Sequence, residues 1–277
     1  DYDHPAATEQ TFRALLPAAE ASGDLGYLLE LKTQIARTLS LQRRFDEAHT
    51  LFDEIEAVLD RAPARPRIRY WLERGRTYNS AGQIEQARPC FDTAWKQAQA
   101  TQEDFYAIDA AHMLAIVESD QGALDWNLKA LALAENSADE RARKWRGSLY
   151  NNIGWTYHDR GDYAAALDIF HKALDLRLAD GKPSPIRIAR WCIARTLRSL
   201  GRVEEALAMQ QALLSEHTPE DDPSGYTYEE LGECLLLLGR EAEARPYFAQ
   251  AYAILSQDGW LVANEPARLE RLRALGQ

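Results

Sequence analysis

The chain has 277 residues, of which 46% are hydrophobic and 27% are charged, and these proportions are ordinary for a folded globular protein. Its formal net charge is -11, which repels phosphate backbones, so we expect no nucleic acid partner. No stretch approaches the roughly 18 consecutive apolar residues of a membrane span, so we expect no membrane partner either.

Helical spacing of apolar residues, punctuated by turn residues, predicts helices along the whole chain. A first helix is expected at 5–21, as an N-terminal cap. Six helix pairs follow, at 25–41 and 45–60, 66–81 and 84–100, 103–120 and 123–135, 139–160 and 163–179, 184–200 and 203–216, and 224–238 and 241–256. A last helix at 263–275 is expected to cap the other end, because the end faces of a stacked array need covering.

Breaks rich in proline, glycine or small residues separate several pairs, at 62–66, 180–185 and 218–225. None is long enough to be an interdomain linker. We therefore expect residues 1–277 to form a single domain, in which the repeats cover 25–256. No segment shows sustained strand alternation.

Three segments repeat one pattern of small and large residues. Starting from a glycine, the offsets of 3, 7, 12, 16 and 19 residues carry a large residue, a glycine, an alanine, a phenylalanine and an alanine. The three copies are Gly75, Tyr78, Gly82, Ala87, Phe91 and Ala94; Gly154, Tyr157, Gly161, Ala166, Phe170 and Ala173; and Gly232, Leu235, Gly239, Ala244, Phe248 and Ala251. Small residues suit places where helices approach closely, and the glycine at offset 7 suits the left-handed end of a helix.

Weaker copies extend the pattern to about six repeats. The turn positions are Arg43, Gly82, Gly122, Gly161, Gly201 and Gly239, which gives a period of about 40 residues. Around Gly122 the alanine of the second helix, Ala130, comes four residues early. That shift is about one helical turn, so we expect the second helix of this repeat to be short.

This pattern resembles the tetratricopeptide repeat, which has an aromatic residue, a glycine, a tyrosine, a turn glycine and then alanine, phenylalanine and alanine. The fourth repeat shows it from Tyr150 and Ile153 onward, and the resemblance covers roughly 25–256. It implies an all-α, right-handed solenoid of about six helix-turn-helix pairs with terminal capping helices. The period of about 40 exceeds the usual 34, and in this it resembles an extended subgroup found in peptide-sensing regulators and in scaffold or cargo adaptors.

The resemblance implies that the first helix of each pair lines a concave groove. If the small residue of each repeat is position 8, then position 9 faces the groove, and it is an arginine in three repeats: Arg37, Arg76 and Arg195. Guanidinium groups suit carboxylates, with bidentate geometry, so these arginines could bind an acidic ligand. They could equally pair with acids of the groove itself, such as Glu30 and Glu73.

The fourth and fifth repeats place amides and tryptophans on the same face. Relatives with extended repeats often hold a peptide backbone with an asparagine at the position of Asn152, which lies beside Asn151; an amide can both donate to and accept from a peptide unit. A bond to a neighbouring helix is the alternative. Trp155 and Trp191 fall on groove positions of adjacent repeats, where tryptophans are typical interface anchors.

The charges of this face are unevenly distributed. The basic residues lie in repeats one, two and five, and the acids gather in the last repeat, at Glu229, Glu230 and Glu233. This polarity favours a ligand that carries charges of both signs. The three cysteines, Cys90, Cys192 and Cys234, lie far apart and fall in helical patterns. We read them as buried reduced thiols, which favours a cytoplasmic location.

Nothing in the sequence predicts catalysis. His158 and Asp159, with His112 one repeat earlier, could form part of an acid–base or metal site. Motifs for a metal, a nucleophile or a phosphate loop do not accompany them. We therefore expect no enzymatic activity, no catalytic residues, no metal and no cofactor.

The sequence favours a protein-interaction scaffold that binds an extended peptide or a partner helix in its groove. Asn151, Asn152, Trp155, Trp191 and Arg195 would form the centre, and Arg37 and Arg76 would extend it toward the N-terminus. One alternative is a regulatory sensor that binds a small ligand or a signalling peptide. Another is a self-assembling solenoid, such as a homodimer, which an exposed apolar face on the helix at 263–275 would favour.

Overall fold

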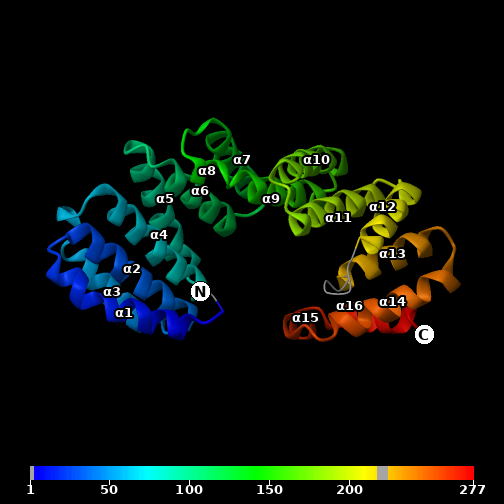
Figure 1. The fold of residues 1–277 in the computed structure, drawn as a ribbon, viewed down its shortest axis with the longest axis horizontal. Helices are drawn as coiled ribbons and strands as arrows, with labels where there is room; N and C mark the ends of the chain where they lie inside the picture. Colours follow the sequence, from blue (N-terminus) through cyan, green and yellow to red (C-terminus); the bar gives the residue numbers. More distant parts are fainter. Residues whose placement is uncertain (1–2, 217–223) are drawn as a thin grey trace. The chain divides into compact units, whose positions relative to one another are not determined.

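A computed structural model describes residues 3–216 and 224–277, and of residue 120 it describes the backbone alone. Most of the predicted break at 218–225 therefore lies outside the described residues. The contacts of the chain fall into two compact units, Asp1–Leu149 and Tyr150–Gln277, and each is described by itself. Within the described residues the structure consists of helices, turns and loops without strands, which confirms the all-α prediction (Figure 1).

The helices follow the predicted pairs closely. The first unit contains α1 (Pro5–Ala21), α2 (Leu25–Leu41), α3 (Phe45–Glu56), a 3-10 turn (Leu59–Arg61), α4 (Ala64–Ser80), α5 (Ile84–Ala100), α6 (Asp104–Val117), α7 (Asp120–Asn136), α8 (Glu140–Arg143) and the start of α9 (Arg146–Asp159). The second unit contains the rest of α9, then α10 (Tyr163–Asp180), α11 (Pro183–Ser199), α12 (Val203–Ser215), α13 (Gly225–Leu237), α14 (Glu241–Leu255), α15 (Gly259–Asn264) and α16 (Pro266–Leu275). None of the helices in the described part of the chain combines the length and apolar character that crossing a membrane requires.

The glycine that begins the repeated pattern makes room for the phenylalanine of the second helix. A Cβ atom added to Gly232 would lie 2.8 Å from Cδ1 of Phe248, and one added to Gly75 would lie 2.5 Å from Cε1 of Phe91. Phe91 and Phe248 are both fully buried. The spacing of 16 residues between the glycine and the phenylalanine therefore arises because the ring packs directly on the backbone of the facing helix.

Outside the third repeat, the turns within the pairs use a left-handed residue, as predicted. Gly161 has a φ of 78°, and Arg43, which stands at the turn position of the first repeat, has a φ of 61°. Arg43 thus takes a conformation that favours glycine. Its agreement with the other turns supports its place in the repeat alignment.

The third repeat corrects one prediction. Its second helix, α7, is not short: it has 17 residues and begins at Asp120. Gly122 lies inside this helix and not at the turn. The two residues between α6 and α7, Glu118 and Ser119, are both extended. Because α6 already ends at Val117, before the predicted 120, and the link is short, the second helix starts earlier, and the early position of Ala130 follows.

Three other predicted helix boundaries also change. The helix expected at 139–160 is broken into α8 and α9, and at the break the Nε of Arg146 donates to the carbonyl oxygen of Arg143 at 3.0 Å. The helix expected at 45–60 ends at Glu56 and continues as the 3-10 turn. The last helix begins at Pro266 and is preceded by α15; proline suits the first turn of a helix because its missing N–H would be unpaired there.

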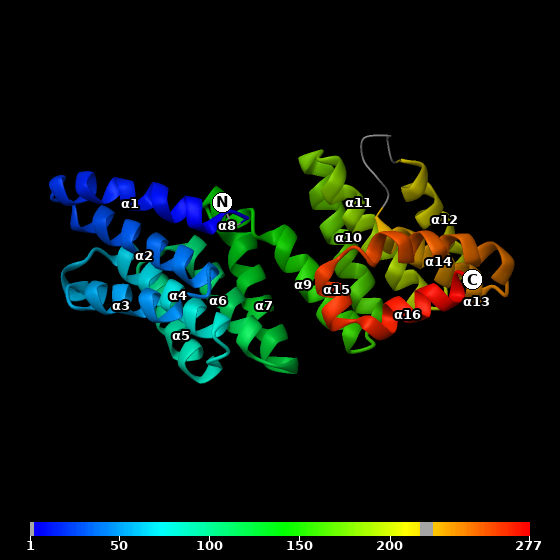
Figure 2. The same cartoon turned by 90° about the horizontal axis from the view of Figure 1, so that it is seen from below.

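Both terminal helices are packed as caps. In the first unit, Ala19 of α1 lies in one buried cluster with Leu29 and Ile35 of α2. In the second unit, α16 runs beside α14 (Figure 2), and Leu269 and Leu272 are buried in the cluster that contains Phe248. These leucines point into the core, so α16 does not present the exposed apolar face that would have favoured self-assembly.

Candidate functional site

The second unit brings the two predicted tryptophans together. Trp155 of α9 lies beside Trp191 of α11, with ring centroids 5.9 Å apart, and Trp191 lies 6.2 Å from the ring of Tyr226 on α13. The indole N–H of Trp191 also donates to the carbonyl oxygen of Tyr226 at 3.3 Å. These three half-buried rings, which we call the aromatic row, cross the first helices of three successive repeats. One turn before Trp191, Ile188 is 56% exposed.

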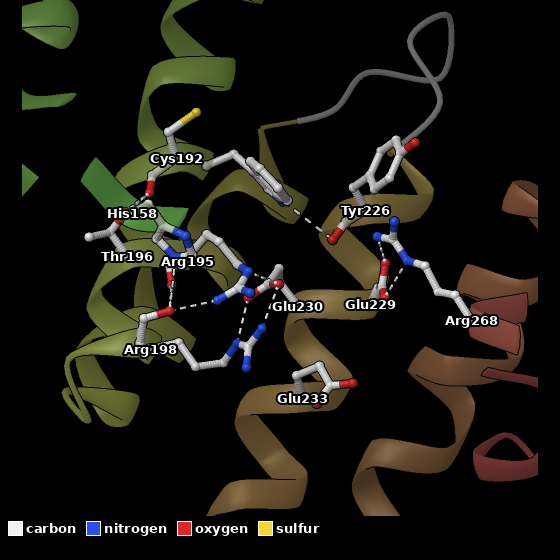
Figure 3. Close-up of polar contacts among 12 residues, drawn as sticks. His158, Cys192, Arg195, Thr196, Arg198, Tyr226, Glu229, Glu230, Glu233 and Arg268 are labelled. Atoms are coloured by element: carbon white, nitrogen blue, oxygen red, sulfur yellow. Dashed lines mark hydrogen bonds and ion pairs between the residues drawn. The ribbon is translucent and has the colours of Figure 1, made fainter. Parts of the chain in front are cut away.

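Arg195 is held by an acid of the next repeat. Its Nε lies 3.0 Å from Glu230 Oε1, and Arg198 makes two bonds to the same carboxylate, at 2.7 and 2.9 Å (Figure 3). Glu230 is only 4% exposed. Burial lowers the pKa of Arg198, but its hydrogen bonds and charge interaction with Glu230 outweigh burial, so the pKa is raised. Arg195 is therefore paired with an acid of the groove itself, which was the alternative to binding an acidic ligand.

His158 joins this network through a serine. The Oγ of Ser199 accepts from Arg195 Nη1 at 2.7 Å and lies 3.0 Å from His158 Nε2. Burial lowers the pKa of His158, and the charge of Arg195 lowers it further, against the opposing effect of Asp159, whose Oδ1 lies 3.7 Å from Nδ1. Because Arg195 already donates to the hydroxyl, Ser199 serves as a link between the imidazole and the guanidinium.

The lowered pKa of His158 predicts a loss of stability in mild acid. The ordinary pKa near 6.5 applies to the unfolded chain, so below that pH the unfolded chain binds the proton more readily. The stabilisation is therefore complete above about pH 6.5 and is lost as the pH falls below it. We expect the urea midpoint of unfolding to fall between pH 7 and 5.5, and to fall less in His158→Asn. An equal fall in His158→Asn and in the wild type would contradict this, and His171→Asn, at an exposed site of the same unit, is the control.

The two asparagines lie half-buried on α9. The side-chain oxygen of Asn151 is 3.8 Å from the thiol of Cys192 on α11, a weak hydrogen bond. The backbone carbonyl oxygen of Asn152 accepts from the hydroxyl of Thr156 at 2.9 Å. Burial raises the pKa of Cys192 to about 12, so this thiol stays protonated at neutral pH.

The acids of the last repeat are also paired, by arginines of the C-terminal cap that sequence reasoning missed. Arg268 of α16 holds Glu229 with two bonds, at 2.9 and 2.5 Å, and its guanidinium lies 5.2 Å from the ring centroid of Tyr226 (Figure 3). Arg271 pairs with Glu233, with one bond at 3.1 Å. A signal was present: these partners lie 39 and 38 residues apart, which is one repeat period.

In the first unit, Arg37 and Arg76 converge on one buried acid. Glu73 of α4 lies 2.8 Å from Arg76 and 3.7 Å from Arg37 of α2, and Arg76 also binds Asp109 of α6. Arg69 lies 3.5 Å from Glu30. The predicted site residues thus form two groups, one in each unit, and here too the arginines pair with groove acids.

His112, the remaining titratable candidate, is half-buried in the first unit. His112 packs on Trp145, with ring centroids 5.3 Å apart, and burial lowers its pKa. Across residues 3–216 and 224–277, histidine, cysteine and acidic side chains do not come together in a group of three or more that could hold a metal ion.

Comparison with known proteins gives the class of the fold. Models of the tetratricopeptide repeat match residues 68–101, 146–179 and 186–257, together about half of the chain. The chain belongs to the tetratricopeptide repeat family. A search of curated proteins finds no match.

Several solved structures share the fold at low sequence identity. The apo form of the quorum sensor NprR from B. thuringiensis is 16% identical, with a TM-score of 0.67 over 98% of this chain and 76% of that chain. The apo form of RapI is 12% identical, with a TM-score of 0.71 over 93% of this chain and 75% of that one. A tetratricopeptide repeat protein from Parabacteroides merdae is 17% identical, with a TM-score of 0.56 over 99% and 95%.

Proposed function

We propose that the protein is a non-enzymatic scaffold that binds an extended peptide or a partner helix on the first-helix face of its second unit. The observation that carries this proposal is the aromatic row with exposed Ile188 beside it. Tryptophan and tyrosine are enriched among the residues that dominate binding at the centre of an interface. Trp155 and Trp191 supply the apolar area, and Arg195 borders it.

The asparagines have a different part in this proposal. Asn151 and Asn152 would meet the backbone of the bound segment, because amides can pair with peptide units whatever the side chains. Arg37 and Arg76 would contribute in the first unit, where their guanidinium groups stay partly exposed beside the buried Glu73. The three free, buried cysteines suit a reducing compartment, and we propose the cytoplasm.

A sensor of signalling peptides is the second candidate. NprR, which shares this fold, is described as a quorum sensor and has been solved with its cognate peptide NprX, and that complex has a TM-score of 0.53 and 15% identity to this chain. The fold can therefore hold a peptide. Both candidates place the ligand on the same face, so one experiment tests them together.

The test is a pull-down from the native cell lysate with bound proteins and peptides quantified by mass spectrometry. Ile188→Asp places a charge at the exposed centre of the face without disturbing a buried contact. Leu178→Asp is the matched control, since Leu178 is 48% exposed but lies on α10, the second helix of its pair. We expect at least one partner to be lost by Ile188→Asp and retained by Leu178→Asp and the wild type. Identical captures by all three proteins would contradict the proposal.

A further inference from the structure

We infer that the segment bound by the second unit carries little net charge and is recognised mainly by one large aromatic or aliphatic side chain, which packs on Ile188 and the aromatic row. This inference rests on the proposed function and names the chemistry of its ligand. It replaces the expectation that the ligand carries charges of both signs, which was drawn from the sequence without knowledge of the ion pairs.

The arginines of α11 are already engaged by a buried acid. Glu230 accepts from both Arg195 and Arg198, and it is almost completely buried. A ligand carboxylate that recruited Arg195 would take away one of the two cations that neutralise Glu230. Removing a partner from a buried ion pair leaves an uncompensated charge, which is strongly unfavourable. An acidic ligand would therefore gain little from this guanidinium.

The acids of α13 are engaged in the same way. Glu229 is held by Arg268 in a two-bond arrangement, and Glu233 is held by Arg271. Such paired contacts between arginine and carboxylate are strong and fix both groups. A basic ligand would have to break one of them, so the three glutamates do not favour a lysine or an arginine on the ligand.

What the face does offer is apolar area at its centre. Trp191 touches both other members of the aromatic row, and Ile188 projects one turn away with more than half of its surface exposed. An aromatic or aliphatic side chain laid there would bury its own surface together with that of Ile188, and this burial needs no bond to be broken. Arg268 over the ring of Tyr226 keeps this end of the row in place.

The inference is tested with a phage library of random 12-residue peptides selected against the wild-type protein. We expect the enriched peptides to gain Trp, Phe, Tyr, Leu or Ile at one position, with no enrichment of acidic or basic residues. Individual synthetic peptides should then bind with a Kd that changes less than about twofold between 50 and 500 mM NaCl, because apolar contacts are not screened by salt. Ile188→Asp should weaken binding by about tenfold or more, and Leu178→Asp should leave it unchanged.

Two outcomes would overturn the inference, and they can be told apart. Enriched peptides that are acidic or basic, with binding that weakens steeply in salt and still depends on Ile188, would overturn the ligand chemistry and leave the proposed function standing. A library that yields no peptide sensitive to Ile188→Asp would overturn both. Circular dichroism of each variant verifies that it is folded.

Discussion

Replacing Glu230 by glutamine should lower the free energy of unfolding by about 2–4 kcal/mol, because it removes the shared counter-charge of Arg195 and Arg198. Breaking a buried ion pair by changing one partner typically costs about 3–5 kcal/mol, and the partial exposure of Arg195 reduces this figure. Glutamine keeps the size of the side chain, so packing is unchanged. Its amide N–H₂ group, however, would face guanidinium donors.

Urea denaturation followed by circular dichroism measures this effect. The matched control is Glu243→Gln in the same unit, since Glu243 pairs with Arg240 on an exposed helix surface. Exposed pairs contribute little, so the control should leave the urea midpoint where it is in the wild type. If the two variants shifted the midpoint equally, Glu230 would not be the centre of a buried charge network.

Gly232→Ala should destabilise the second unit by about 1–2 kcal/mol, although alanine is the better helix former. The added methyl group would overlap the ring of Phe248, which is fully buried and cannot move away freely. Overpacking of this kind costs about 1–3 kcal/mol. The higher helix propensity of alanine offsets only about 1 kcal/mol of this cost, so we expect a net loss of stability.

A double-mutant cycle identifies the cause. Phe248→Leu makes room for the methyl group, so the change Gly232→Ala should cost less in that background than in the wild type. Gly259→Ala is the control, because a Cβ at Gly259 meets nothing within 4 Å. A destabilisation by Gly232→Ala that was the same with leucine or phenylalanine at residue 248 would show that the ring is not the obstacle.

The same glycine and phenylalanine explain why so much of the fold could be predicted. A ring packed on a helix backbone demands a fixed spacing, and Gly232 with Phe248 displays that spacing in the sequence itself. Where the link between helices changes, this signal fails. Glu118 and Ser119 are extended and shorten the turn of the third repeat. Neither position has a glycine or a proline that would predict the change. The break between α8 and α9 was missed for a similar reason, since a side chain of Arg146 satisfies a carbonyl there.

The candidate site could be predicted only in part. Helical spacing placed Trp155 and Trp191 on one face, and the structure brings their rings into contact. The fate of the charges depended on partners in the neighbouring repeat, which a list of residues on single helices does not supply. Treating the last helix as a further copy of the repeat would have set Arg268 and Arg271 opposite Glu229 and Glu233.

The charges of the second unit also restrict how its array could be lengthened or shortened. Along α11, α13 and α16 the inner charges run basic, acidic, basic. Deleting the middle repeat would bring the arginines of α11 against those of α16, and duplicating it would bring glutamates against glutamates. Loss or gain of one repeat at this point would therefore create like-charge contacts, whereas insertion of a basic and an acidic repeat together would preserve every pairing. The ion pairs thus allow the number of repeats to change here only in steps of two. Unequal recombination that adds or removes a single copy should therefore rarely yield a stable protein.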